Sequence, residues 1–174
     1  MIARNLRRAA VAVGALVVLL TGTAGTATAS GGIVYGPEWR KIVNAETGFC
    51  VDIRQQDGPD VPGSRAQQWN CTGVDEQHWL PTPVPGLSNI FTFTEGRNHL
   101  CLDVHLASGD PGTVLQQWPC NGTAAQQWEI RSTNEIVSQV NFQCMDTTSR
   151  NKGTVLMQWP CNGNLAQRWV LKKF

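Results

Sequence analysis

Three aspartates and three tryptophans in this chain recur at a spacing that suits contact with a sugar. Each aspartate lies two residues after a cysteine, and each tryptophan lies two residues before the following cysteine. The pairs are Asp52 with Trp69, Asp103 with Trp118, and Asp146 with Trp159. A carboxylate accepts hydrogen bonds from hydroxyl groups, and an indole offers a flat face to the C–H face of a pyranose. One such pair alone favours a structural role, but threefold recurrence indicates a sugar site in at least one segment.

The three segments are repeats of one unit. In each, a glycine lies six residues before the first tryptophan, and a second tryptophan lies ten residues after the first tryptophan. The second tryptophans close a Gln-x-Trp within apolar runs, so we expect Trp79, Trp128 and Trp169 in the core. We expect their glutamines to satisfy buried polar groups and to orient the aspartates by hydrogen bonds. Trp39, ahead of the first unit, is also expected in the core. The units occupy residues 36–83, 87–131 and 133–174.

Short strands must position these side chains. Apolar residues alternate with others from Cys101 to Leu106, which is the period of a half-buried strand. Gly, Asn and Pro turn signals separate such runs, and no amphipathic helical pattern appears. The sequence therefore predicts an all-β fold of three homologous four-stranded repeats, with twelve strands in total and pseudo-threefold symmetry. Residues 30–35 are expected to form a short segment ahead of the fold.

The six cysteines are expected to form three disulfides, one within each unit. We predict Cys50–Cys71, Cys101–Cys120 and Cys144–Cys161. In antiparallel strands the residue numbers of facing residues have a constant sum, and this pairing gives each Asp–Trp pair the same sum as its cysteines. It therefore predicts that each aspartate lies directly opposite the first tryptophan of its unit. Each disulfide closes a loop of roughly 20 residues, worth about 3 kcal/mol in the chain-entropy model.

Residues 1–29 have the layout of a secretory signal peptide. Three arginines precede an uncharged run from Ala9 to Leu20, and small residues lead to an expected cleavage after Ala29. The alternative of a membrane anchor is disfavoured, because the run falls short of the roughly 20 apolar residues that span a bilayer. The Arg7-Arg8 pair is a weak match to a twin-arginine signal. The sequence therefore predicts a secreted, extracellular protein, a compartment in which disulfides form.

Charge excludes two classes of partner. Of 14 basic residues, three lie in the leader with no acid, so 11 basic and 13 acidic residues remain after cleavage, a net charge of −2. No basic face is left to neutralise phosphates, so no nucleic acid is expected as a partner, and no membrane after signal cleavage. The three histidines, His78, His99 and His105, lack metal-ligand spacing. No metal or cofactor is expected.

On these motifs the chain resembles the ricin B-type lectin family, whose β-trefoil consists of three such units. The resemblance covers roughly residues 36–174. It implies a sugar site made by the aspartate, the glutamine and tryptophan of the first Gln-x-Trp, and the Asn-Gln pair that opens the second. Carried over, the implied carbohydrate-binding residues are Asp52, Gln67, Trp69 and Gln77; Asp103, Gln116, Trp118 and Gln126; and Asp146, Trp159 and Gln167.

The chain departs from the family at the asparagine, where it has Glu76, Ala125 and Ala166. In the third unit Met157 also replaces the first glutamine. Losing one such hydrogen bond costs about 0.5–1.5 kcal/mol, which weakens a site without abolishing it. Asn121 and Asn162, just after the second cysteine of their units, are candidate substitutes, and Glu76 could accept a hydroxyl proton. We rank the second unit as the strongest site, then the first, then the third.

The sequence predicts a secreted, non-catalytic lectin module that binds glycan or polysaccharide, alone or beside a separately encoded secreted enzyme. Glycoside hydrolysis needs two carboxyl groups about 5–10 Å apart, and the repeated aspartates belong to three separate units. The alternative is a secreted protein-binding trefoil, a protease inhibitor or toxin subunit, whose sugar sites have degenerated. The departures at Glu76, Ala125 and Ala166 fit that alternative, whereas the three intact aspartates argue against a third option, a spacer without ligand.

Overall fold

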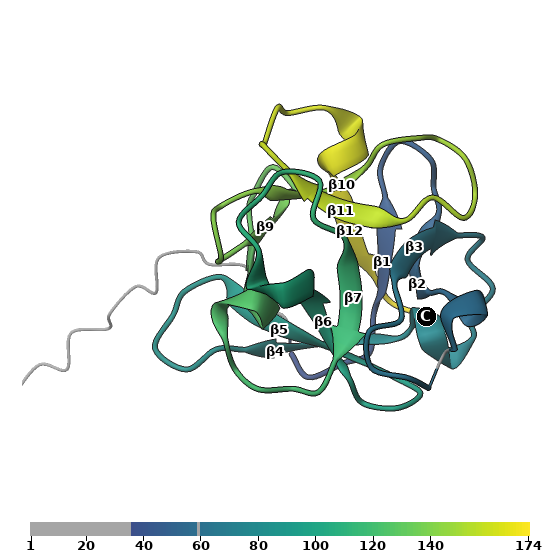
Figure 1. The fold of residues 1–174 in the computed structure, drawn as a ribbon, viewed down its shortest axis with the longest axis horizontal. Helices are drawn as coiled ribbons and strands as arrows, with labels where there is room; N and C mark the ends of the chain where they lie inside the picture. The colour runs from purple at the N-terminus through teal and green to yellow at the C-terminus, as the bar shows by residue number, and fades with distance from the viewer. Residues whose placement is uncertain (1–35, 59) are drawn as a thin grey trace, which may run out of the picture. The chain divides into compact units, whose positions relative to one another are not determined.

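The computed structural model describes residues 36–58 and 60–174, so the expected signal peptide (1–29) and the segment 30–35 lie outside the described residues (Figure 1). The described chain is built from short strands joined by turns, as the alternating pattern predicted. The strands are β1 Lys41–Asn44, β2 Cys50–Ile53, β3 Ala66–Trp69, β4 Trp79–Pro83, β5 Ile90–Glu95, β6 Cys101–Val104, β7 Leu115–Trp118, β8 Trp128–Ile130, β9 Ile136–Ser138, β10 Cys144–Thr147, β11 Leu156–Trp159 and β12 Trp169–Lys172. Five single-turn 3₁₀ helices lie between them, at Gln55–Asp57, Asp75–Gln77, His105–Ala107, Ala124–Gln126 and Leu165–Gln167. Within the described ranges, no helix has the length and apolar character needed to cross a bilayer.

The strand pairing repeats three times. In each unit the second strand pairs antiparallel with the first and third, as β2 does with β1 and β3. The fourth strand of each unit pairs with the first strand of the next, which joins β4 to β5, β8 to β9 and β12 to β1. The last of these pairs joins the first and last strands of the fold and so closes the ring of units. Four strands per unit and twelve in all are thus confirmed.

The centre of the fold is held by backbone hydrogen bonds between units. Glycine lets the chain turn with a positive φ just before each third strand, and the turn of one unit bonds the third strand of the next. Gly63 N donates to Gln117 O at 2.8 Å, Gly112 N to Gln158 O at 2.8 Å, and Gly153 N to Gln68 O at 2.8 Å. Strands β3, β7 and β11 therefore brace one another in a closed cycle, so that each unit depends on both others.

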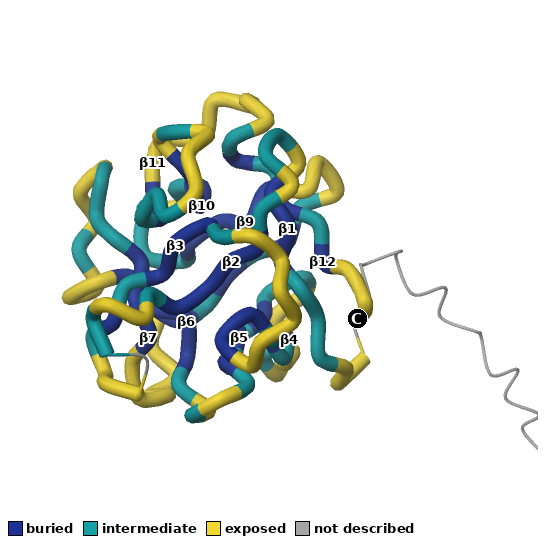
Figure 2. The backbone as a smooth tube through the Cα atoms, turned by 90° about the vertical axis from the view of Figure 1, so that its right-hand side faces the viewer, coloured by how far each residue is buried: buried dark blue, intermediate teal, exposed yellow. Residues whose placement is uncertain are grey.

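The core forms around the three second tryptophans, as predicted. Trp79, Trp128 and Trp169 are at most 1% exposed, and each indole N–H donates to a carbonyl of its own unit's second strand, at 2.9 to 3.1 Å. Figure 2 shows the buried segments gathered in the middle of the fold, with exposed loops around them. The prediction for Trp39 is wrong. It precedes the first strand and is only half-buried, with its ring 6.3 Å from that of His99.

The three disulfides join the predicted cysteines, with Cα atoms 5.1 Å apart in each. The predicted strand register is wrong by two residues. Cys101 lies opposite Trp118, and Asp103 lies opposite Gln116, with equivalent registers in the other two units. The reason is that the second cysteine lies beyond the end of the third strand, in an exposed loop, so that the disulfide does not link facing residues. Each tryptophan is instead a diagonal neighbour of its aspartate, still on the same face.

Candidate functional site

In the second unit, Asp103 is held by two glutamine amides. The residue is 4% exposed, and its carboxylate accepts from Gln116 Nε2 at 2.9 Å on Oδ1 and from Gln126 Nε2 at 3.1 Å on Oδ2. Gln126 has one orientation, because its Oε1 accepts from Asn121 N at 2.8 Å and its Nε2 also donates to Pro119 O at 3.0 Å. Each carboxylate oxygen can accept two hydrogen bonds, so each retains capacity for one more.

An open hollow of about 300 Å³ lies beside this carboxylate. The Trp118 side chain on its wall is 41% exposed, and Leu106 is 82% exposed. His105 Nδ1 lies 2.8 Å from Gln116 Oε1 and so connects the wall to the Asp103 cluster. The lining residues are Asp103, His105, Leu106, Ala107, Gln116, Trp118, Asn121, Thr123 and Ala125. The hollow thus combines acceptor oxygens at its base with a flat aromatic wall.

The first unit repeats this arrangement. Asp52 accepts from Gln67 Nε2 and from Gln77 Nε2, both at 2.8 Å. Its hollow, of about 310 Å³, is lined by Asp52, Arg54, Gln55, Gln56, Gln67, Trp69, Thr72 and Val74.

Glu76, which replaces the family's asparagine in the first unit, is not among the residues lining that hollow. It is 3% exposed, and its Oε1 accepts from Gln55 Nε2 and Arg97 Nη1, both at 2.7 Å. Burial alone would raise the pKa of Glu76, but hydrogen bonds from its own backbone, Gln55 and Arg97 hold that pKa below its usual value. Arg97 belongs to the second unit, so Glu76, a candidate acceptor of a sugar hydroxyl proton on sequence grounds, links two units instead.

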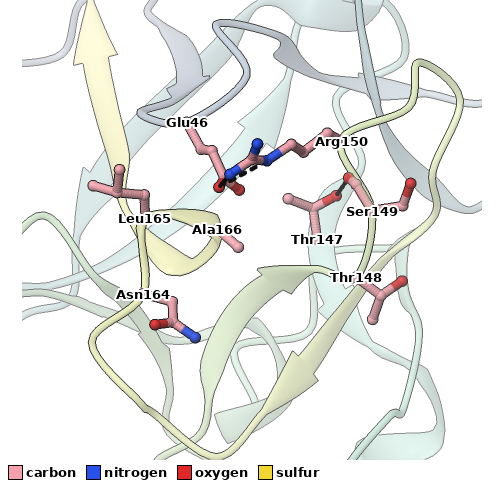
Figure 3. A pocket seen from close by; sticks show the side chains of 8 residues that line it. All are labelled: Glu46, Thr147, Thr148, Ser149, Arg150, Asn164, Leu165 and Ala166. Atoms are coloured by element: carbon pink, nitrogen blue, oxygen red, sulfur yellow. Dashed lines mark hydrogen bonds and ion pairs between the residues drawn. The ribbon is translucent and has the colours of Figure 1, made fainter.

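The third unit keeps only part of the cluster. Asp146 accepts from Gln167 Nε2 at 2.6 Å, while Met157 stands opposite it and has no amide to donate. The nearby hollow, of about 540 Å³, is displaced toward the first unit, where Glu46 accepts from Arg150 Nε at 2.9 Å (Figure 3). It is lined by Glu46, Thr147, Thr148, Ser149, Arg150, Asn164, Leu165 and Ala166. The predicted residues Asp146, Trp159 and Asn162 do not line this hollow, whereas their second-unit equivalents Asp103, Trp118 and Asn121 line one together.

Sequence reasoning missed several lining residues. Arg54, His105 and Thr148 each lie two residues after the aspartate of their unit, so aligning the repeats could have found them. Glu46 contributes to the third unit's hollow from the first unit, and no local motif marks it. Within residues 36–58 and 60–174, no group of three or more His, Cys, Asp or Glu side chains could hold a metal ion.

Burial raises the pKa of all three aspartates above the ordinary value of 3.8. The glutamine hydrogen bonds act against burial in each case. A nearby carboxylate raises the pKa further in the first and third units, from Glu76 and Glu46 respectively, whereas His105 acts in the lowering direction on Asp103. Protonation removes acceptor capacity from the carboxylate, so contact with a hydroxyl donor depends on pH.

We expect glycan affinity to fall on acidification from pH 7, starting above the ordinary pKa of an aspartate. The effect of these aspartates on the stability of the fold has the opposite pH dependence. A carboxyl group whose folded pKa is raised stabilises the fold fully below its unfolded pKa, and this contribution is lost as pH rises through the folded value. Protonation of these three aspartates therefore weakens binding without itself destabilising the fold. Titration calorimetry and circular dichroism in the same buffers, from pH 7 to 4, measure both; constant affinity down to pH 4 would contradict the prediction.

Each tryptophan of the candidate sites rests against a glycine of a neighbouring unit. A Cβ added to Gly153 would lie 3.3 Å from Trp69 Cζ3, at Gly112 it would lie 3.5 Å from Trp159, and at Gly63 it would lie 3.8 Å from Trp118. The glycine that lies three residues before each third strand thus supports the aromatic wall of another unit.

We expect Gly153→Ala to disturb the first unit's site as well as the backbone. The φ of +85° makes alanine strained by about 1–2 kcal/mol, and the added methyl group would press on Trp69. Gly122→Ala is the matched control, because Gly122 has a φ of +71° with open space around its Cβ. Urea denaturation should show similar losses for both variants, while near-ultraviolet circular dichroism should change for Gly153→Ala. Equal spectra would show that Trp69 does not depend on this contact.

Twelve strands in three repeated units, with a glutamine-bonded aspartate beside a tryptophan, define a β-trefoil of the lectin class. The chain belongs to the ricin-type β-trefoil lectin domain family, whose model matches residues 38–169. This confirms the predicted resemblance and fold class. A search of curated proteins finds no match.

Solved structures with the same fold include a designed protein, part of an enzyme and a lectin. The designed threefold-symmetric protein ThreeFoil matches with a TM-score of 0.72 and 21% identity, over 78% of this chain and 99% of its own. The exo-β-1,3-galactanase 1,3Gal43A of Clostridium thermocellum matches with a TM-score of 0.73 and 25% identity, over 82% of this chain but only 31% of its own. The ricin B-like lectin of Macrolepiota procera, solved in complex with lactose, matches with a TM-score of 0.68 and 16% identity, over 82% and 99%.

Proposed function

We propose that this protein is a secreted, non-catalytic lectin module that binds glycan or polysaccharide through Asp, Trp and Gln side chains in up to three repeats. The observation that carries the proposal is the second unit's hollow. There Asp103, fixed by Gln116 and Gln126, faces open space beside the exposed Trp118. Two sugar hydroxyls would donate to the carboxylate while the sugar's C–H face stacks on the indole.

The order of site strength follows from the same contacts. In the second unit Ala125 replaces the family's asparagine, but Asn121 lines the hollow and its Nδ2 can donate to a sugar oxygen. The first unit keeps both glutamines, and Thr72 takes the place of Asn121. The third unit lacks the first glutamine and so holds its aspartate least firmly. We therefore rank the second unit first and the third unit last.

Secretion is part of the proposal. The leader at residues 1–29 and three disulfides both support an extracellular location, where thiols oxidise. The chain resembles a part, 31%, of a galactanase chain, and we propose that this protein acts either alone or beside a separately encoded secreted enzyme. Three shallow sites on one body would gain affinity for a polymer through multivalency.

A polysaccharide pull-down and a glycan array test this function. We expect the wild type to bind, and the triple variant Asp52→Ala, Asp103→Ala, Asp146→Ala to lose binding. The matched control is Asp75→Ala with Asp110→Ala, which removes exposed carboxylates outside the clusters. Trp118→Ala provides a second test at a position that is 41% exposed, whereas Asp103 is 4% exposed. The proposal is wrong if the wild type binds no glycan, or if the triple variant binds as the wild type does.

A further inference from the structure

The three hollows differ at an equivalent position two residues after the aspartate. Arg54 occupies it in the first unit, His105 in the second and Thr148 in the third, and each lines the hollow of its own unit. The backbone places Arg54 and His105 alike, because their N–H groups donate to Arg65 O and Val114 O across the same strand pair. The repeats thus present three different chemistries to a bound glycan.

The first unit adds a second cation at its aromatic wall. Lys152, from the third unit, places its ammonium 4.5 Å from the centre of the Trp69 ring. Trp69 is correspondingly only partly exposed, whereas Trp118 and Trp159 are 41% and 43% exposed. Arg54 donates from Nε and Nη2 to the amide oxygen of Gln56, at 3.1 and 2.8 Å, so its guanidinium is held in place by a neutral partner.

The other arginines near these hollows are already neutralised. Arg65 pairs with Asp57 at 2.8 Å, Arg97 pairs with Glu76 and Asp60, and Arg150 pairs with Glu46. In the described part of the chain, neither Arg54 nor Lys152 forms an ion pair with a carboxylate. Arg54 lines the hollow and is therefore available to an anion brought by a ligand, while Lys152, which is not among the lining residues, adds a positive charge on the Trp69 ring.

We infer that the first unit selects an acidic saccharide, one that carries a uronic acid. This rests on the proposed function, because it assigns a ligand class to one of the same sites. In such a glycan, a neutral sugar residue would contact Asp52 and Trp69. The carboxylate of the uronic acid residue would lie on the Arg54 side of the hollow, away from Asp52. A guanidinium binds a carboxylate through two parallel hydrogen bonds, and Lys152 adds a second positive charge. The second and third hollows lack this pair of cations and take neutral saccharides.

The test isolates the first unit by silencing the other two with Asp103→Ala and Asp146→Ala. The probe is a glycan array of matched pairs, in which each uronic acid glycan has its carboxyl-reduced hexose counterpart. We expect the acidic member of a pair to bind about tenfold more tightly, equivalent to about 1.4 kcal/mol. Adding Arg54→Thr, the third unit's residue type, and Lys152→Gln should bring the two members to equal affinity. The background Trp118→Ala with Trp159→Ala silences the same units through exposed residues, should the aspartate variants misfold.

The control variant is Lys41→Gln with Lys172→Gln, which removes two cations that face each other across β1 and β12 and line none of these hollows. It should keep the preference for the acidic member; loss of the preference here would mean general charge attraction and overturn the inference. If the chain in which only the first unit is active binds both members of each pair equally, the inference fails while the lectin function stands. If the wild type binds no glycan of either kind, the proposed function itself fails.

Discussion

Replacing Asp103 by asparagine should weaken glycan binding at the second unit by about 30-fold, or roughly 2 kcal/mol. Hydrogen bonds to a charged acceptor are worth about 1.5–3 kcal/mol, against about 0.5–1.5 for neutral ones, and the carboxylate is expected to accept two from the sugar. The variant also replaces one carboxylate oxygen by an NH2 group, so this group would face the side-chain NH2 group of Gln116 or Gln126, donor against donor. Gln126 cannot turn to relieve this, because Asn121 N and Pro119 O fix its orientation. The cluster therefore loses its geometry as well as its charge.

The measurement is titration calorimetry with a short oligosaccharide, in a background where Asp52→Ala and Asp146→Ala silence the other units. Asp110→Asn is the control, since Asp110 is exposed and its carboxylate accepts only a local bond from Ser108 at 3.0 Å. It should leave affinity within twofold of the background. Unchanged affinity for Asp103→Asn would remove the carboxylate from the mechanism.

Replacing Trp128 by phenylalanine should lower the free energy of unfolding by about 2–4 kcal/mol. Trp128 is fully buried, and its indole N–H donates to Leu102 O at 3.1 Å. The smaller ring leaves a cavity and an unpaired buried carbonyl. A loss of this size is a large fraction of the stability of an ordinary domain. Urea denaturation should show a lower midpoint with an unchanged slope.

The same substitution at Trp118, ten residues earlier in the same unit, provides the matched contrast. Because Trp118 is 41% exposed, Trp118→Phe should cost less than about 1 kcal/mol of stability. It should nevertheless weaken glycan binding, because a phenyl ring offers a smaller stacking surface. Comparable stability losses in the two variants would contradict the division between core and site tryptophans.

The repeats made most of the fold predictable from sequence. Three copies of one spacing predict the strand count, the disulfide pairs and which tryptophans are buried, because each copy tests the same pattern independently. The predicted hydrogen bonds from Gln77, Gln126 and Gln167 to the aspartates are also confirmed. These are contacts within one unit, where chain spacing carries most of the geometric information.

The errors arose where spacing does not determine geometry. The register prediction assumed that disulfide-linked residues face each other across two strands, but Cys71, Cys120 and Cys161 lie in the loops beyond. Contacts between units were also invisible. Arg97 on Glu76, Glu46 on Arg150 and Lys152 on Trp69 each join residues from different repeats, and no local motif marks such a pair.

The pairing of β1 with β12 makes the first and last strands of the fold neighbours. The same antiparallel pairing joins β4 to β5 and β8 to β9 inside the chain. A circular permutant, with the ends of the domain linked and a new start opened in the exposed turn between β4 and β5, would keep every strand pair. Any of the three units could therefore come first along the chain. The cyclic order of the units, and so the arrangement of unlike sites around the molecule, would stay the same.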